Sequence, residues 1–209
     1  MLASEPRQAG GAGRDARTAA GDLLRASILI VSYNGRAHLD ACLGSLAAGE
    51  QRDSEVIVVD NASQDGSAEH VARRYPHVRL VRSVSNLGFG AGNNLGARHA
   101  RGEYLAFLNP DTEPEPGWLE ALIGALEHDP RAGLATALVL LMEAGDRVNT
   151  CGNDMHLTGL TLCRGMGARR EAFSATAEVS AISGAAFAMR RDLFESLGGF
   201  DESFFLYVE

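Results

Sequence analysis

The sequence predicts an α/β fold, in which helices cover both faces of a largely parallel sheet. The first indication is three short, predominantly apolar segments, residues 27–31, 55–59 and 104–108, of which the second has four β-branched residues in a row. Continuous apolar runs of this length are typical of strands buried on both faces of a parallel sheet. The second indication is that segments with helical spacing of apolar residues separate these runs, which is the alternation of βαβ units.

The elements of the first 141 residues follow in a regular order. Residues 37–48 are predicted to form a helix, because Leu39, Leu43 and Leu46 recur at helical spacing. The same criteria predict the remaining elements of this part: a helix at 65–75 that Pro76 ends, a strand at 78–81, a glycine-rich link into a helix that ends near His99, a helix at 115–127 and a strand at 132–141.

This alternation stops after Met142. Residues 143–177 are rich in Gly, Thr, Asn and Arg, so we expect loops and short hairpins there. A buried strand is predicted at 183–189, and a short helix at 192–197 is terminated by two glycines. Residues 1–26 contain many Ala, Gly and Arg residues without the apolar centre of a secretory signal, and we interpret them as a disordered leader.

Composition and charge exclude several classes of protein. A hydrophobic content of 45% with 22% charged residues is ordinary for a soluble globular protein. The net charge of −8, without a dense stripe of Lys and Arg, argues against nucleic-acid binding. No apolar stretch approaches the roughly 18 residues that a membrane-spanning helix requires. The three cysteines, Cys42, Cys151 and Cys163, lack CxxC spacing, which favours buried or incidental thiols in a reduced, cytoplasmic setting.

Short polar groups follow each of the three apolar runs, at residues 32–34, 60–61 and 109–111. Open α/β sheets bind ligands outside the carboxyl ends of their strands, so these groups predict a shared site. Asp111 follows Pro110, which restricts the turn. Its carboxylate could hold a hard divalent cation against a diphosphate. The alternative is a strand-ending turn with a solvated aspartate.

Residues 86–94 form a glycine-rich stretch whose meaning the residues alone leave open. Alternating glycines allow backbone N–H groups to approach an anion, and the following helix N-terminus would add its dipole. The spacing is G-x-G-x-G after the third strand, however, and a dinucleotide fingerprint requires G-x-G-x-x-G after the first. A purely structural loop is the alternative.

Taken together, these segments resemble the family 2 glycosyltransferases, which have a GT-A fold. The matching pieces occur in family order and cover nearly everything from Ser27 to the C-terminus: Ile30 to Asn34, Val58 to Gly66, Asn86 to Gly96, Gly102 to Tyr104, Leu108 to Asp111, Gly198 to Glu202 and Tyr207 to Glu209. Within the family, the asparagine-proline-aspartate variant is most similar to bacterial rhamnosyltransferases.

The resemblance implies roles for individual residues. Residues 27–141 would be the half that binds the nucleotide sugar, and residues 142–209 an incomplete acceptor-side segment that includes Gly184. Asp111 would hold Mg²⁺ or Mn²⁺, whereas Asn109 replaces the first aspartate of the family's aspartate-x-aspartate motif and removes one negative charge. The donor would contact Val31, Ser32, Tyr33, Asn34, Asp60, Asn61, Asn86, Gly88, Asn93, Asn109 and Asp111.

The mechanism that the resemblance implies is a single inverting displacement, in which a base deprotonates the acceptor hydroxyl. In the family this base is the aspartate of a glutamate-aspartate pair. Glu209 matches the glutamate, and the sequence ends there. We therefore expect a fragment truncated at its C-terminus. The alternatives are a natural truncation that binds donor without efficient transfer, and Glu209 as a substitute catalytic base.

The resemblance also implies the biological setting. The partners would be a nucleotide-diphosphate sugar and a saccharide or lipid-linked acceptor, in the synthesis of bacterial cell-surface polysaccharide or glycolipid. The location would be the cytoplasm or, with peripheral membrane contact, the inner face of the membrane. A metal-dependent nucleotidyltransferase is the alternative enzyme, although the chain has no basic glycine-rich loop early in its sequence.

Overall fold

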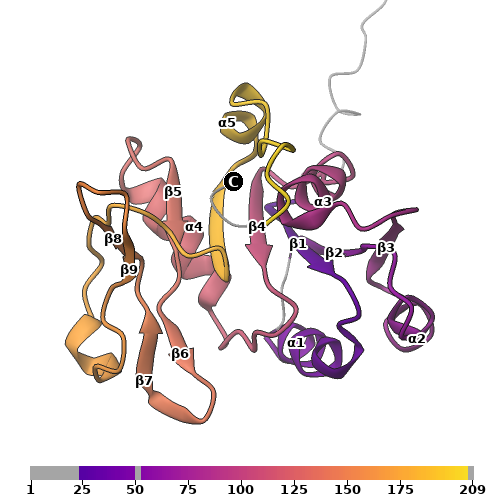
Figure 1. Ribbon diagram of the computed structural model, residues 1–209, viewed down its shortest axis with the longest axis horizontal. Helices are drawn as coiled ribbons and strands as arrows, with labels where there is room; N and C mark the ends of the chain where they lie inside the picture. Colours follow the sequence, from indigo (N-terminus) through magenta and orange to yellow (C-terminus); the bar gives the residue numbers. More distant parts are fainter. Residues whose placement is uncertain (1–23, 50–52, 207–209) are drawn as a thin grey trace, which may run out of the picture.

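The structure, a computed structural model, describes residues 24–49 and 53–206. Its centre is a six-stranded sheet in the order β3-β2-β1-β4-β10-β5 (Figure 1). The first four strands along the chain are parallel, and β10 runs antiparallel between β4 and β5. The strands are β1 (Ala26–Ser32), β2 (Ser54–Asp60), β3 (Arg79–Arg82), β4 (Tyr104–Leu108), β5 (Leu134–Thr136) and β10 (Ala186–Arg190). The predicted, largely parallel sheet is confirmed.

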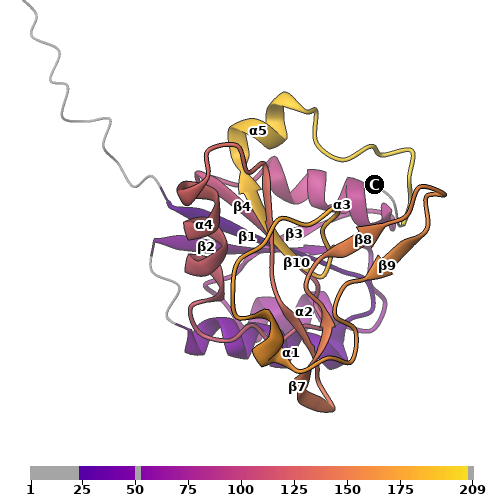
Figure 2. The same ribbon diagram turned by 90° about the vertical axis from the view of Figure 1, so that its left-hand side faces the viewer.

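Helices cover both faces of this sheet, as predicted. One core cluster joins Ile28 and Ile30 of β1 to the helices α1 (Arg36–Ala48), α2 (Ser67–Arg74) and α4 (Trp118–His128). The other joins Leu29, the residue between them, to α3 (Gly88–Ala97) through its partly buried Phe89 and Ala97, and to α5 (Arg191–Ser196) through its buried Phe194. Successive side chains of a strand point to opposite faces, so an uninterrupted apolar run can serve both clusters. Figure 2 shows α3 and α5 above the sheet and α1 and α2 below it.

The prediction of a glycine-rich link before a helix is wrong. Most of the stretch, from Gly88 on, belongs to helix α3 itself. Its glycines allow the helix backbone to approach the sheet closely. A Cβ atom at Gly92 would lie 2.8 Å from Cγ1 of Val31, and one at Gly96 would lie 3.1 Å from Cγ2 of Val59. Tertiary packing therefore outweighs the low helix propensity of glycine here.

The strand predicted at 132–141 is divided between two sheets. Its first part, β5, pairs with β10 in the main sheet, and its second part, β6 (Val139–Leu141), pairs with β7 (Ala144–Thr150). The apolar pattern continues through both parts, so it could not indicate the change of partner. β6 pairs antiparallel with β7, the strand that follows it directly in the chain, and not with a strand of the main sheet.

Residues 143–177 contain the short hairpins that the sequence predicts. Besides β7, they include a hairpin of β8 (Asn153–Met155) and β9 (Thr161–Cys163), and a 3-10 helix at Arg170–Phe173. The leader predicted for residues 1–26 lies mostly outside the described residues, and Ala26 already belongs to β1. The division between residues 141 and 142 stays a prediction, and β10 from the later segment is part of the main sheet.

The start of β4 is anchored to β1 by a polar contact within the sheet. The buried hydroxyl of Ser27 accepts hydrogen bonds from the backbone N–H groups of Arg101 (3.1 Å) and Gly102 (2.9 Å), and it donates to Glu55 (2.9 Å). A Cβ atom at Gly102 would overlap the backbone of Ala26 and Ser27. Only glycine allows this approach of two chain segments.

We predict that Gly102→Ala lowers the free energy of unfolding by about 2–3 kcal/mol or more, because the added methyl group must displace backbone atoms. Gly44→Ala is the matched control, since Gly44 is an exposed residue of helix α1 and nothing lies within 4 Å of its added Cβ atom. This control should raise the free energy by roughly 0.5–1 kcal/mol. Urea denaturation followed by circular dichroism measures both values, and equal midpoints for Gly102→Ala and the unsubstituted chain would contradict the packing described.

Candidate functional site

The carboxyl ends of β1, β2 and β4 meet at one edge of the sheet. Ser32 pairs in register with Asp60, the last residues of β1 and β2. After β4 ends, the N–H of Asn109 donates to the carbonyl of Ala185 (2.9 Å), which places Gly184 and Ala185 beside the Asn109 turn. The polar groups predicted to share a site are thus carried by neighbouring strands.

Asp60 is buried yet has an unpaired carboxylate oxygen. The residue is 6% exposed, and its Oδ1 atom has no hydrogen-bond partner in the structure. The neighbouring hydroxyl oxygen of Ser32 is also buried and unpaired. A buried polar atom without a partner costs about 1–3 kcal/mol, so a pair of them side by side points to a polar ligand that completes their hydrogen bonds.

The loops after β1 and β2 hold each other in place. Asn34, with a φ of 52°, donates from its backbone N–H to the hydroxyl of Ser63 (2.9 Å). Its side-chain oxygen accepts from the N–H of Gln64 (2.8 Å). Tyr33 lies between these contacts and β1 with half of its surface exposed, at 50%. Tyr33 can therefore meet a ligand directly, while Asn34 fixes the loop that presents it.

Three predicted donor-site residues form one hydrogen-bonded unit. The side chain of Asn61 accepts from the N–H of Leu87 (2.9 Å) and donates to Oδ1 of Asn86 (2.9 Å) and to the carbonyl of Gly88 (3.1 Å). Asn86 Oδ1 also accepts from the N–H of Gly88 (3.0 Å). These contacts attach the loop before α3 to the end of β2 and determine where α3 begins.

Asn93 and Gly88 both lie on α3, and Gly88 is also part of the hydrogen-bonded unit of Asn61 and Asn86. Asn93 is buried and donates to the carbonyl of Phe89 (3.1 Å). Gly88 has a φ of 82°, and a Cβ atom there would overlap the carbonyl of Phe205. The end of the described chain thus lies against the start of α3, where the N–H of Phe89 donates to the same carbonyl (2.9 Å).

The turn of Asn109, Pro110 and Asp111 rests on helix α1. The carbonyl of Asn109 accepts hydrogen bonds from the hydroxyl of Thr112 (2.7 Å) and from the thiol of Cys42 (3.8 Å). Burial raises the pKa of the Cys42 thiol to about 12, and the charge of Asp111 adds to this shift. Cys42 is therefore a neutral packing residue beneath the turn and not a nucleophile.

Asp111 is an exposed carboxylate that makes no hydrogen bond or ion pair with any other described residue. Within the described ranges, 24–49 and 53–206, no group of three or more His, Cys, Asp or Glu side chains could hold a metal ion. A single free carboxylate suits Mg²⁺ or Mn²⁺ only if other ligands come from phosphate oxygens and water, which is the usual arrangement for Mg²⁺. The donor set fits a metal carried with a diphosphate.

Asn94 is a residue whose role sequence reasoning missed. Its side chain accepts from the N–H of Phe200 (2.9 Å) and donates to the carbonyl of Phe200 (2.9 Å) and to Glu202 (3.0 Å). It therefore attaches the chain after Gly199 to α3. The only sequence signal was a second asparagine beside Asn93, which gives no indication of a partner 106 positions away.

The predicted catalytic residue, Glu209, lies outside the described residues. Gly184 is exposed, and a Cβ atom there would be 3.7 Å from the ring of Phe89. The segment that contains Gly184 thus borders the same end of α3 as Gly88.

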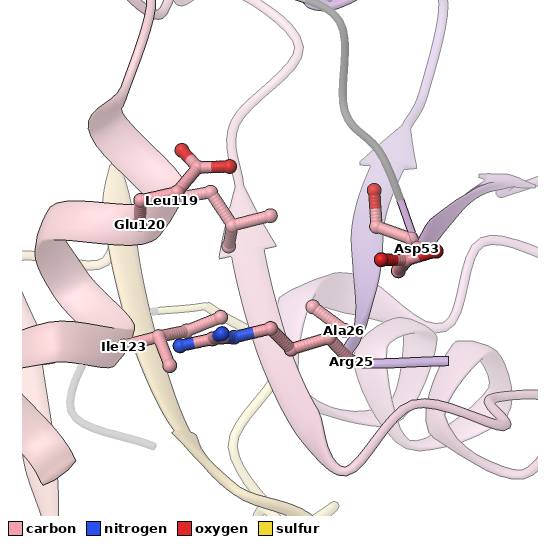
Figure 3. A pocket seen from close by; sticks show the side chains of 7 residues that line it. Arg25, Ala26, Asp53, Leu119, Glu120 and Ile123 are labelled. Carbon is pink, nitrogen blue, oxygen red and sulfur yellow. The ribbon is translucent and has the colours of Figure 1, made fainter. Parts of the chain in front are cut away.

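A cavity of about 200 Å³ lies at the opposite edge of the sheet, where β1 and β2 begin. Figure 3 shows Arg25 reaching toward Ile123 of α4 in this cavity. Arg25 is already paired with Glu127 (3.0 Å). Since this cavity contains none of the unpaired buried groups, we assign the candidate site to the carboxyl edge.

None of the helices in the described part of the chain is both long and apolar enough to cross a bilayer.

The chain was compared with known proteins. The sequence profile of glycosyl transferase family 2 matches residues 27–198. N-acetylglucosaminyl-diphospho-decaprenol L-rhamnosyltransferase of Mycobacterium tuberculosis is 30% identical over 204 residues, which is 87% of this chain and 66% of that protein. Cholesterol galactosyltransferase of Borreliella burgdorferi is 31% identical over 108 residues, 50% of this chain and 30% of that protein. The chain thus spans slightly less than two thirds of the first relative and a smaller share of the second.

Solved structures show the same fold. The mannosyltransferase PcManGT of Pyrobaculum calidifontis, in complex with GDP-Man and Mn²⁺, superposes with a TM-score of 0.62 at 22% identity, over 85% of this chain and 48% of that one. TarS of S. aureus in complex with UDP-GlcNAc gives a TM-score of 0.56 at 18% identity, over 83% and 47%. The predicted GT-A type of fold is confirmed. The profile match covers most of the sequence, and we conclude that this chain belongs to glycosyl transferase family 2 and is rhamnosyltransferase-like.

Proposed function

We propose that the chain carries the donor site of an inverting glycosyltransferase, which moves a sugar from a nucleoside diphosphate to an acceptor hydroxyl in cell-surface glycan synthesis. The proposal depends most on the buried, unpaired oxygens of Asp60 and Ser32 at the carboxyl edge. The rhamnosyltransferase relative acts on a diphosphate-linked polyprenol by its name, which supports a lipid-linked acceptor. The relatives favour sugar transfer over the alternative of nucleotidyl transfer.

The nucleoside would bind at the ends of β1 and β2. Asp60 would accept a hydrogen bond from the base or ribose, and Ser32 would complete its own hydrogen bond with the ligand. Val31, half-buried, and Tyr33, half-exposed, would provide apolar surface beside them. Asn34, Asn61 and Asn86 would fix three loops around the nucleoside. Asn34 joins the loop after β1 to Gln64 in the loop after β2, and Asn61 joins the end of β2 to Asn86 in the loop before α3.

The diphosphate would lie toward the turn after β4. Asp111 would hold Mg²⁺ or Mn²⁺, and the bound cation supplies charge stabilisation for the departing diphosphate. Asn109 contributes an amide and no charge, so the site offers one carboxylate from this turn. Gly88 and Asn93 would border the sugar, because the start of α3 lies beside both Asn61 and the Gly184 segment.

Inversion requires a base on the acceptor side of the sugar. Two hydrogen-bonded contacts hold the late chain against α3 and support a base from this segment: Asn94 binds Phe200, and the N–H of Phe89 donates to the carbonyl of Phe205, four residues before Glu209. We assign Glu209 as the candidate base within this sequence. A donor-binding module without efficient transfer is the alternative, and a transfer assay distinguishes the two.

We predict that Asp60→Asn weakens nucleotide binding roughly tenfold to hundredfold, the loss expected for one hydrogen bond to a charged group. The free energy of unfolding should stay equal or rise, because the substitution removes a buried unpaired charge. Calorimetric titration with UDP-, TDP- and GDP-sugars in Mn²⁺ gives the affinity, and urea denaturation gives the stability. Asp129→Asn, far from the edge at the end of α4, is the control. Unchanged affinity for every nucleotide would count against the donor site.

We predict that Asp111→Asn removes the extra thermal stabilisation that Mn²⁺ provides in the presence of the bound nucleotide. Asp111 is exposed, so the melting temperature without ligands should hardly change. Glu113→Gln, a neighbouring exposed carboxylate, is the matched control and should keep the Mn²⁺ effect. Asn109→Asp should increase Mn²⁺ affinity by adding a second carboxylate. If Asp111→Asn retained full Mn²⁺ dependence, the metal would have to bind elsewhere.

A further inference from the structure

Residues 199–205, which we call the strap, are attached to helix α3 at two places. Near the start of the strap, the side chain of Asn94 bonds to both backbone groups of Phe200: it accepts from the N–H and donates to the carbonyl, each at 2.9 Å. Near its end, the carbonyl of Phe205 accepts from the N–H of Phe89 (2.9 Å), in the first turn of α3. Figure 2 shows the strap beside α3, between α5 and the described end of the chain. The strap therefore lies along the helix and runs in the opposite direction.

Two glycines allow the strap to approach Asn94. Gly198 and Gly199 have φ angles of 83° and 79°, in the left-handed region that residues with a side chain rarely adopt. A Cβ atom at Gly199 would lie 2.5 Å from Oδ1 of Asn94, whereas nothing lies within 4 Å of a Cβ atom at Gly198. Asn94 is 8% exposed, and its second amide hydrogen is donated to Glu202 (3.0 Å). Both hydrogens of the amide thus have partners, and loss of this side chain would leave the N–H and carbonyl of Phe200 without theirs.

One peptide group connects the strap to the end of β2. The carbonyl of Gly88 and the N–H of Phe89 belong to the same planar peptide group. Its carbonyl accepts from the side chain of Asn61 (3.1 Å), and its N–H donates to the carbonyl of Phe205 (2.9 Å). Asn61 directly follows Asp60, whose buried carboxylate oxygen has no partner. Because the peptide group is rigid, a movement of Asn61 that rotates it also changes its bond to the strap.

We propose that Asn94 is a positioning residue, which docks the strap on α3 so that the placement of residues 200–205 and the binding of the nucleotide at the end of β2 depend on each other. This inference rests on the proposed function, because the donor nucleotide is the ligand that would meet Asp60. The connection runs from Asn61 through the peptide group between Gly88 and Phe89 to the strap. A bound nucleotide would restrain Asn61 and stabilise the docked strap. Coupling between two sites is reciprocal, so the docked strap favours nucleotide binding by the same factor.

Amide hydrogen exchange of Phe89 tests the docking of the strap. The first N–H groups of a helix have no acceptor within the helix, and in the described part of the chain the partner of this one is the carbonyl of Phe205. Asn94→Ala should raise the exchange rate of the Phe89 amide about tenfold or more, because the strap loses its other attachment. Asn94 itself forms no hydrogen bond with Phe89, so the effect has to pass through the strap. An unchanged exchange rate in this variant would overturn the proposal.

A matched pair of glycine variants makes the same test without changing the buried Asn94. Gly199→Ala and Gly198→Ala both place a side chain at a positive φ, but only the former brings a methyl group against Asn94. Gly199→Ala should therefore raise the exchange rate of the Phe89 amide well above that of Gly198→Ala, and equal rates in the two variants would count against the docking. Glu202→Gln is a further control, since it keeps an acceptor oxygen for the Asn94 amide and removes only a charge. It should leave the exchange rate and the nucleotide affinity unchanged.

Nucleotide binding tests the coupling. In the unsubstituted chain, a saturating UDP-, TDP- or GDP-sugar with Mn²⁺ should slow the exchange of the Phe89 amide about fivefold or more, relative to a core amide of β4 that corrects for stabilisation of the whole fold. Calorimetric titration of Asn94→Ala with the same nucleotide should show weaker binding, by up to that same factor. A residue with a merely structural role would lower the melting temperature without this agreement. Nucleotide binding that leaves the exchange of Phe89 unchanged would overturn the coupling, as would full nucleotide affinity in a variant that has released this amide.

Failure of the proposed function gives a different set of results. If none of the nucleotides bound to the unsubstituted chain, the donor site would be wrong and its coupling to the strap would be wrong with it. The faster exchange of Phe89 in Asn94→Ala and Gly199→Ala needs no nucleotide, so it would still show that Asn94 docks the strap. If the nucleotides bound as proposed and these exchange rates did not change, the donor site would stand and the role of Asn94 would be wrong.

Discussion

The close contact between helix α3 and strands β1 and β2 sets the geometry of the whole carboxyl edge. Gly92 and Gly96 bring the helix backbone against Val31 and Val59, so close that an added Cβ atom would force the valine side chains to shift. From this position α3 holds two other parts of the chain. Its start is bonded to the Asn61 side chain, and Asn94 on its buried side holds Phe200. The loop before α3 and the late segment of the chain thus share one support.

The site carries a cost that the rest of the fold must offset. Asp60 and Ser32 leave polar atoms unpaired in a buried position, next to β1 residues with no exposure at all. Each such atom costs about 1–3 kcal/mol, a sizeable part of the 5–15 kcal/mol that stabilises a typical domain. Extensive apolar contacts, such as the stacked rings of Phe107 and Phe187 with centroids 4.6 Å apart, lie beneath the edge and compensate for it. A well-packed sheet therefore holds the two unpaired oxygens in fixed positions.

The sequence was sufficient for the elements but not for their long-range partners. Apolar runs predicted β1, β2 and β4 to within a residue, and helical spacing predicted α1 equally well, because these periodicities are local; the predicted start of α4 was three residues too early. The glycine-rich stretch was placed before a helix since glycine alone disfavours one, and only the neighbouring strands explain why α3 contains it. The Asn61–Asn86 bond and the Asn94–Phe200 bonds join residues 25 and 106 positions apart, which no local pattern encodes. The clustering of polar residues at the carboxyl edge could be predicted, and their roles in a site stay a prediction, whereas the hydrogen bonds between them could not be predicted.

Strand β10 has a consequence for the order in which the protein forms. It lies between β4 and β5, so β5 has no place in the main sheet until residues 186–190 have been synthesised. At usual rates of translation, the synthesis of the intervening segment takes on the order of seconds. During this time the edge of β4 exposes unpaired backbone groups and the ring of Phe107 lacks its partner Phe187. A nascent chain in this condition is a substrate for chaperones and a hazard for aggregation, and the arrival of β10 ends both.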